Sequence, residues 1–346
     1  MTAALAHIGE EHPPAAIPDT MRALRIDIVS PDLSGVRIVR IATPQPGPDE
    51  VLVRIRAASV GFPDLLTARG LYHSKPELPY VGGSDVAGEV VAIGADVTRF
   101  QIGDHVAAMY RGGGFAEFSC YPASAVFPKP ARLSFAEAAA LGSAYLTAYV
   151  ALVRYGALAH GEWLLVHGAS GGVGLAAVDL GRALGARVVA AISAPRKRSL
   201  VANEYGPEAV IDGKAGFRET VKSITGGGAD VIFDPVGGEV FTESTRCIAF
   251  GGRLLVVGFA GGRPAELATN ITLVKGFSVC GVRAGEYGRK FPERGRENME
   301  AIQKLAAEGT IRPRVHAEVP FARWRDAFQM IVDRAVVGRA VLVFET

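Results

Sequence analysis

From residue 162 onward, short apolar runs alternate with amphipathic stretches of helical period. The apolar runs predict strands at 162–167, 187–192, 209–211, 230–234, 253–258 and 278–282. The stretches that follow four of these runs predict helices at 172–184, 195–205, 216–225 and 237–248. Strands and helices that alternate in this way are typical of an α/β fold, a doubly wound parallel sheet with helices on both faces.

The region before this sheet has a different pattern. Between residues 21 and 130, short apolar runs alternate with turns rich in Gly and Pro. Several short strands at this spacing predict a compact, barrel-like β unit. An Ala/Leu-rich segment at 134–155 follows, and Ser134 with Glu137 matches a capping box at the start of a helix.

The two ends of the chain break both patterns. Residues 1–20 show no periodicity and contain three prolines, so we expect a mobile arm there. Near the other end, the pattern predicts a helix at 295–308, an extended segment at 313–319, a helix at 320–333 and a strand at 339–344.

Composition narrows the class of protein. The 346 residues suffice for two domains, and 49% of them are apolar, enough for a core in each. A net charge of +2 gives no basic surface for nucleic acid, and no run approaches about 18 apolar residues, so we expect neither a nucleic-acid partner nor a membrane span. Three scattered cysteines and a start without a signal-peptide pattern favour a cytoplasmic protein.

Residues 166–174 read VHGASGGVG, between the first predicted strand of the sheet and its first helix. Glycine at such a turn lets a pyrophosphate approach free backbone N–H groups at the positive end of the helix dipole. The expected cofactor-binding residues of this loop are Gly168, Ala169, Ser170, Gly171, Gly172, Val173 and Gly174. The alternative is a tight turn that binds nothing.

The end of the second predicted strand indicates which dinucleotide binds. An acidic residue is expected there for NADH, but the chain has Ser193, followed by three cations. A hydroxyl and cations attract a 2′-phosphate, so the sequence predicts NADPH, unless the cations form a solvated first helical turn. The expected residues are Ser193, Arg196, Lys197 and Arg198, with Gly258 and Phe259 after the fifth strand.

Seven groups of motifs together resemble one protein family. They are GFPDLL (61–66) with RGLY (69–72), PYVGGSDVAG (79–88), GDHV (103–106), YLTAY (145–149), ASGGVG (169–174), DPVGG (234–238) and KGFSVCG (275–281). With them the chain, from about Met21 to Phe344, resembles the medium-chain dehydrogenase/reductases. Among these it is most similar to the zinc-independent quinone oxidoreductases, the zeta-crystallin-like branch.

The resemblance implies a domain plan. A GroES-like catalytic domain is expected from residues 21–147 and 286–346, and an NADPH-binding Rossmann domain from residues 148–285 inserted between them. The active site is then expected in the cleft between the domains. Members of this branch associate through their Rossmann sheets, so a homodimer or homotetramer is expected.

The resemblance also bears on metal. Zinc-using relatives carry His at the position of Ser84 and Cys near the position of Gly61, so two of three catalytic ligands are missing and no metal is expected. Hydride transfer from NADPH to an electron-poor acceptor remains feasible. The expected substrate is a quinone or an α,β-unsaturated carbonyl (an enone), with enoyl compounds, including thioesters, as the near-equal alternative. A catalytically idle NADPH-binding protein is the alternative of another class.

By the same resemblance, two residues are expected at the reacting end of the cofactor. Tyr72 is expected to bond a substrate oxygen or the nicotinamide edge, and Thr147 the carboxamide. The alternatives are a packing aromatic for Tyr72 and, for Thr147, a hydroxyl bonded to its own helical turn. The expected substrate-pocket residues are Gly61, Phe62, Asp64 and Tyr287.

Several of these positions leave a choice open or depart from the family pattern. Asp64 is either a catalytic acid or, as the pattern favours, a cap of the helix that starts there. His167 either contacts phosphate or packs in the turn. Many relatives have Asn where this chain has Gly61, so a wider pocket or a missing polar anchor is expected. Relatives often have Tyr, near the adenosine 2′-phosphate, where this chain has Gly213.

Overall fold

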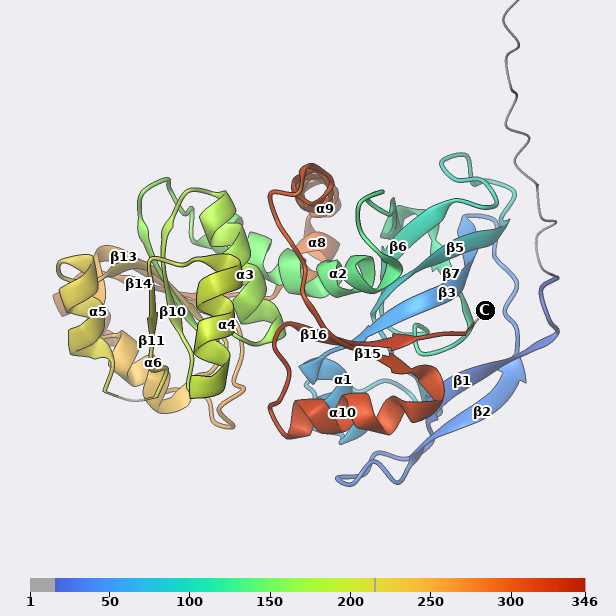
Figure 1. The fold of residues 1–346 in the computed structure, drawn as a ribbon, viewed down its shortest axis with the longest axis horizontal. Helices are drawn as coiled ribbons and strands as arrows, with labels where there is room; N and C mark the ends of the chain where they lie inside the picture. Colours follow the sequence, from blue (N-terminus) through green and yellow to red (C-terminus); the bar gives the residue numbers. More distant parts are fainter. Residues whose placement is uncertain (1–15, 215, 346) are drawn as a thin grey trace, which may run out of the picture.

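The computed structural model describes residues 16–214 and 216–345, and one half of the molecule contains a six-stranded parallel sheet (Figure 1). The sheet runs in the order β11–β10–β9–β12–β13–β14. Its strands are β9 (Trp163–His167), β10 (Arg187–Ala191), β11 (Ala209–Ile211), β12 (Ala229–Asp234), β13 (Ile248–Val256) and β14 (Ser278–Gly281). This is the strand order of the Rossmann fold, so the predicted doubly wound sheet is confirmed.

Helices cover both faces of this sheet. They are α3 (Gly172–Ala183), α4 (Pro195–Tyr205), α5 (Arg218–Thr225), α6 (Gly238–Ser244) and α7 (Thr269–Lys275). Successive side chains of β9 point to opposite faces: Leu164 belongs to the apolar cluster that includes α3, and Leu165 to the cluster that includes α5 and α6. Burial on both faces explains why the strands are continuous apolar runs in the sequence.

The other half contains a seven-stranded sheet and a three-stranded sheet. The larger sheet runs β15–β16–β3–β5–β6–β8, with β7 also paired to β3, and the smaller runs β2–β1–β4. The strands are β1 (Thr20–Ile26), β2 (Val36–Ala42), β3 (Glu50–Val60), β4 (Tyr80–Val81), β5 (Asp85–Ile93), β6 (His105–Met109), β7 (Phe118–Pro122), β8 (Val126–Pro128), β15 (Val315–Pro320) and β16 (Arg339–Val343). Because β16 pairs with β3, both ends of the chain build this half.

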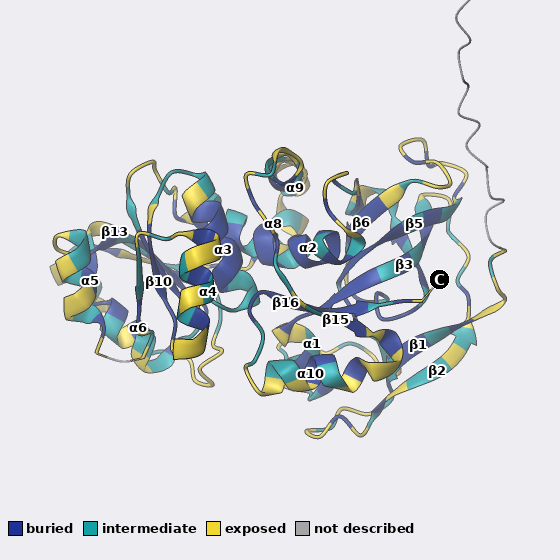
Figure 2. Ribbon diagram, viewed as in Figure 1, coloured by how far each residue is buried: buried dark blue, intermediate teal, exposed yellow. Residues whose placement is uncertain are grey.

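The remaining helices lie outside these sheets. They are α1 (Phe62–Ala68), α2 (Phe135–Tyr149), α8 (Ala284–Lys290), α9 (Pro292–Glu308) and α10 (Trp324–Val332), with 3-10 turns at Ala123–Ala125 and Phe321–Arg323. In Figure 2 the buried residues of α2 and α3, coloured dark blue, lie where the two halves meet. The predicted capping box at the start of α2 is confirmed, since Glu137 N donates to Ser134 Oγ and Ser134 N to the Glu137 carboxylate.

The helix α2 has a kink and a long apolar continuation. At Gly142 its backbone leaves helical geometry (φ −32°, ψ −107°), and the next amide, Ser143 N, donates to Asp85 Oδ1 at 2.9 Å. With the π-helical turn Val150–Tyr155 it forms a helix of 21 residues that is long and apolar enough to cross a membrane, which the count of apolar runs missed. Of its most apolar window, 67% is buried inside the protein, as in the core helix of a globular fold.

One expected helix is shorter in the structure, and two helices were not expected. The helix expected at 237–248 ends at Ser244, because Cys247 O accepts from Ala229 N and Ile248 pairs with Ala229, which draws the segment into the sheet. The helices α7 and α8 were not predicted from the sequence. Of the expected N-terminal arm, residues 1–15 lie outside the described residues, while Thr20 already belongs to β1.

Candidate active site

The loop 168–174 joins β9 to α3 in a turn that needs glycine. Gly168 has φ +57°, a left-handed conformation, and a Cβ on Gly174 would lie 2.2 Å from Gly168 O. Gly171 caps α3, whose first backbone N–H groups have no partner within the helix. The loop therefore presents backbone donors at the positive end of a twelve-residue helix, which is the chemistry a pyrophosphate needs.

Arg339 of β16 reaches this loop from the other half of the molecule. Its side chain is only 9% exposed, and a Cβ on Gly172 would lie 2.8 Å from its Nε. Nη2 donates to Ser143 Oγ at 2.9 Å and lies 3.8 Å from Asp85 Oδ2, while Nε is buried and has no hydrogen-bond partner among residues 16–214 and 216–345. A guanidinium with an unused donor beside a glycine loop fits a phosphate ligand.

Arg339 is not among the site residues expected from the sequence. The available signal was a cation at the start of a predicted buried strand, directly after Gly338, since an arginine is rarely buried without a charged partner. Its proximity to the loop could not be deduced, because it depends on how β16 crosses to the Rossmann half.

Gly61 and Asp64 lie on the other side of this guanidinium. A Cβ on Gly61 would lie 2.5 Å from Arg339 Nη1, so the space opened by glycine is occupied by the arginine and the expected widening of the pocket is not found. Asp64 Oδ2 accepts a hydrogen bond from Gly61 N at 2.7 Å at the start of α1, the capping role that the sequence pattern favoured.

The Asp64 carboxyl is electrostatically unusual. Burial raises its pKa to about 6, with Asp85 adding to the rise, while the bond from Gly61 N and the charge of Arg339 oppose it. The pKa of the Tyr72 phenol is raised by burial and by Asp64, and lowered by Arg283 and Arg289. Tyr72 therefore stays protonated, as a hydrogen-bond donor, at neutral pH.

The other residues expected at the reacting end and in the substrate pocket differ in what their side chains contact. The Thr147 hydroxyl donates to Ser143 O at 2.7 Å, so it is bonded to its own helical turn and keeps its oxygen as an acceptor. Phe62 is exposed on α1. Tyr287 packs against the rings of Tyr155 and Phe291, and its hydroxyl accepts from Arg294 at 3.3 Å.

The cations after β10 are not equivalent. Ser193 and Arg196 are exposed, and Arg196 has no ion pair or hydrogen bond within residues 16–214 and 216–345. The Lys197 ammonium is buried and donates to two backbone carbonyls of the segment before β16. Arg198 donates to Ile192 O and pairs with Asp212 at 2.9 Å, so two of the three cations expected at a phosphate are engaged elsewhere.

Close packing explains Gly213, where relatives often have Tyr. A Cβ at this position would lie 2.9 Å from the backbone carbon of Ala191 and 3.0 Å from Ile192 N. Backbone atoms cannot move aside as a flexible side chain can, so the chain accommodates only glycine there.

The loop after β13 and the turn after β12 pack together. Phe259 is half exposed, and a Cβ on Gly237 would lie 2.9 Å from its ring, while Gly258 approaches Pro235. His167 is buried at the end of β9, where its Nε2 shares a 2.8 Å hydrogen bond with Ser244 Oγ. Burial lowers the pKa of His167 to about 3, so the ring is neutral and packs in the turn, the alternative to a phosphate contact.

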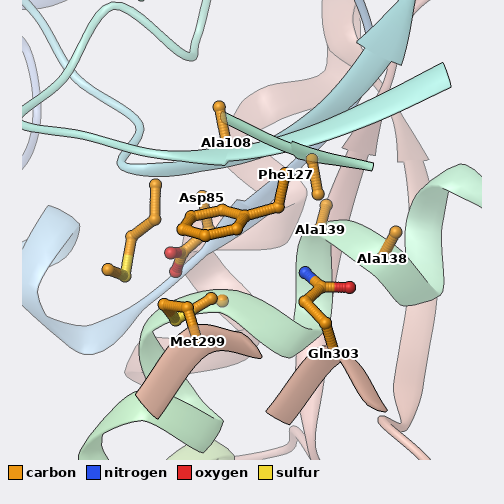
Figure 3. A pocket seen from close by; sticks show the side chains of 10 residues that line it. Asp85, Ala108, Phe127, Ala138, Ala139, Met299 and Gln303 are labelled. Carbon is orange, nitrogen blue, oxygen red and sulfur yellow. The ribbon is translucent and has the colours of Figure 1, made fainter. Parts of the chain in front are cut away.

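Two small cavities adjoin Asp85 and Arg339. The one in Figure 3 lies between the β-rich half, α2 and α9, and is mostly apolar; its labelled lining residues are Asp85, Ala108, Phe127, Ala138, Ala139, Met299 and Gln303. The other is lined by residues of α2, α3 and β16, including Tyr145, Gly172, Gly338 and Arg339. The described part of the chain contains no group of three His, Cys, Asp or Glu side chains that could hold a metal ion.

Two family models match the chain. Residues 47–131 match the alcohol dehydrogenase GroES-like domain, and residues 172–304 match the zinc-binding dehydrogenase family. The quinone oxidoreductase-like protein 2 homolog of Nematostella vectensis is 38% identical over 88% of this chain and 84% of its own length. Human quinone oxidoreductase is 30% identical over 93% of this chain and 98% of its own length.

Comparison with solved structures points to the same family. A probable oxidoreductase from Mycobacterium abscessus superimposes with a TM-score of 0.85 at 35% identity, covering 94% of this chain and 99% of the other. The mycobacterial protein Rv1454c, solved in complex with NADPH, gives 0.86 at 28% identity, covering 93% of this chain and 99% of the other.

The chain therefore belongs to the medium-chain dehydrogenase/reductase superfamily. Within it, the chain is a member of the quinone oxidoreductase-like branch, a class of oxidoreductases that use a nicotinamide cofactor.

The raised pKa of Asp64 predicts a pH-dependent stability. Between about pH 4 and about pH 6 the folded protein keeps a proton that the unfolded chain has lost, so stability falls as pH rises through this window. The isosteric variant D64N keeps an acceptor for Gly61 N but cannot ionise. Urea unfolding of both proteins at several pH values should show wild type losing stability relative to D64N from pH 4 to 6. Parallel curves would contradict the assignment.

Proposed function

We propose that this protein is an NADPH-dependent, zinc-independent reductase of quinones or α,β-unsaturated carbonyls. The observation that carries the proposal is the glycine loop at the start of α3, facing the buried Arg339 of the other half. Loop and arginine together offer backbone donors and a guanidinium to a pyrophosphate, and the relatives named quinone oxidoreductase support the choice of acceptor.

The reacting end depends on hydrogen bonds of the chain's own residues. When bound, the nicotinamide supplies a hydride. The Tyr72 phenol donates a hydrogen bond to the acceptor's oxygen, since its raised pKa keeps it protonated. Thr147 already donates to Ser143 O and uses its free lone pair to accept from the carboxamide. Both residues orient the reactants rather than exchange protons with them, so the proton that completes the reduction after the hydride comes from solvent.

The residues at the positions of the relatives' zinc ligands support chemistry without zinc. Zinc-using relatives carry His at the position of Ser84 and Cys near the position of Gly61; here Gly61 has no side chain and a serine hydroxyl is not a usual zinc ligand. A hydrogen bond polarises a carbonyl less than a dication does, so the acceptor must already be electron-poor. Quinones and conjugated enones meet this condition, as do enoyl thioesters.

The preference for NADPH rests on Ser193 and Arg196. Both are exposed directly after β10, where a Rossmann fold meets the adenosine ribose, and no acidic side chain stands at 193 to repel a 2′-phosphate. Arg198 contributes less, because Asp212 already neutralises its charge.

A screen of acceptors tests the function. Purified protein should oxidise NADPH with 1,2- or 1,4-quinones, enones, enals or enoyl thioesters, with a kcat/KM higher for NADPH than for NADH, and without loss of rate after treatment with a chelator. Product analysis then separates quinone from enoyl reduction. Binding of NADPH with no oxidation by any acceptor would contradict the enzymatic proposal, and loss of activity restored by zinc would contradict the metal-free chemistry.

We further propose that two copies associate through the open edge of β14. This strand ends the sheet with one side unpaired, and apolar side chains cluster next to it: Phe250, which packs over Gly276, is 90% exposed, and Leu273 and Val274 of α7 are 82% and 80% exposed. An unpaired edge beside an exposed apolar patch favours self-association.

Sedimentation equilibrium tests this association. Wild type should sediment as a dimer or tetramer, and L273E should dissociate because two carboxylates would be buried across a twofold axis. I102E, which places the same charge on an exposed apolar residue of the other half, is the control and should leave the mass unchanged. A monomeric wild type, or an intact L273E oligomer, would refute the interface.

A further inference from the structure

The segment that joins α10 to β16, residues 334–338, lies against the glycine loop. Gly338 N donates to Ser170 O at 3.0 Å, and the next residue is Arg339. We call residues 334–338 the crossover segment. Its course decides where the guanidinium of Arg339 meets Gly172, since β16 starts where the segment ends.

Lys197 of α4 holds the opposite end of the crossover segment. Its Nζ donates to Arg334 O at 2.6 Å and to Val336 O at 2.7 Å. The residue is 8% exposed, and no carboxylate pairs with it in the described ranges. Arg334 has φ +51°, a left-handed conformation that arginine rarely adopts, at the end of α10. The bonds of Arg334 N to Ile331 O and of Ala335 N to Met330 O support this turn, and the Lys197 ammonium adds a bond to the Arg334 carbonyl.

We propose that Lys197 is a positioning residue, a latch that fixes the crossover segment over the glycine loop and so sets the affinity for the whole dinucleotide. The inference rests on the proposed function. It assigns different roles to neighbouring cations: Lys197 uses two of its three donors on the other half of the molecule, while the exposed Arg196 reads the 2′-phosphate.

The latch affects nucleotide binding because it orders the crossover segment before the cofactor arrives. With the latch, the segment is held at Arg334, Val336 and Gly338 before any cofactor arrives. Without it, the segment keeps its bonds to the end of α10, the buried Val337 and the contact of Gly338 with Ser170, but loses both hydrogen bonds that tie it to α4. The dinucleotide must then restrict the remaining motion of the segment as it binds. The pyrophosphate is common to NADPH and NADH, so loss of the latch weakens both to the same extent.

The test measures dissociation constants for NADPH and NADH by nucleotide fluorescence, with no acceptor present. K197M should weaken both by roughly tenfold and leave their ratio unchanged. R196Q should weaken NADPH alone. K197R, whose guanidinium also donates to carbonyls, should recover most of the affinity, and K304M, an exposed lysine of α9, should match wild type. K197Q repeats the test should K197M fail to fold.

Hydrogen exchange gives a readout that needs no cofactor. In nucleotide-free protein, amides of the crossover segment should exchange faster in K197M than in wild type, while those of β9 keep their protection. Weakening of NADPH alone by K197M would make Lys197 a phosphate ligand and overturn the inference, as would unchanged affinities or unchanged exchange. A wild type that binds neither dinucleotide refutes the proposed function, whereas the exchange experiment still decides the latch.

Discussion

A buried arginine between the two halves of the molecule is the contact on which the site depends. Arg339 touches the glycine loop on one side and the Gly61, Asp85 and Ser143 group on the other. Burying a guanidinium is costly unless its donors are used, and the Nε of Arg339 has no partner in the part of the chain that the structure describes. The Nε–H group of Arg339 is therefore placed to donate a hydrogen bond to an anion at the start of α3.

This contact explains features that otherwise look unrelated. Glycine at 61 and at 172 leaves room for the guanidinium from both sides, and the kink at Gly142 lets Asp85 reach Ser143. The chain returns to the β-rich half as β16 and brings Arg339 with it, so the split of that half between the two ends of the sequence places this arginine beside the glycine loop. The cation also opposes the rise in the pKa of Asp64.

Periodicity predicted most of the Rossmann half, because strands buried on both faces and helices with one apolar face leave clear patterns. It failed at 245–248, where pairing with β12 overrides a helical pattern, and at α7, whose exposed Leu273 and Val274 give no amphipathic stripe. The loop 168–174 and Ser193 were identified from local spacing. Arg339 and the contacts of Lys197 were not, because both depend on a crossover between residues more than a hundred positions apart.

The affinity of folded R339M for NADPH tests the central claim most directly. If the two halves form one dinucleotide site through this guanidinium, fluorescence titration should give a dissociation constant raised by roughly tenfold or more relative to wild type, since a charge-assisted bond to phosphate is lost. An unchanged dissociation constant would contradict a site shared between the two halves, because the glycine loop would then bind the dinucleotide without the β-rich half.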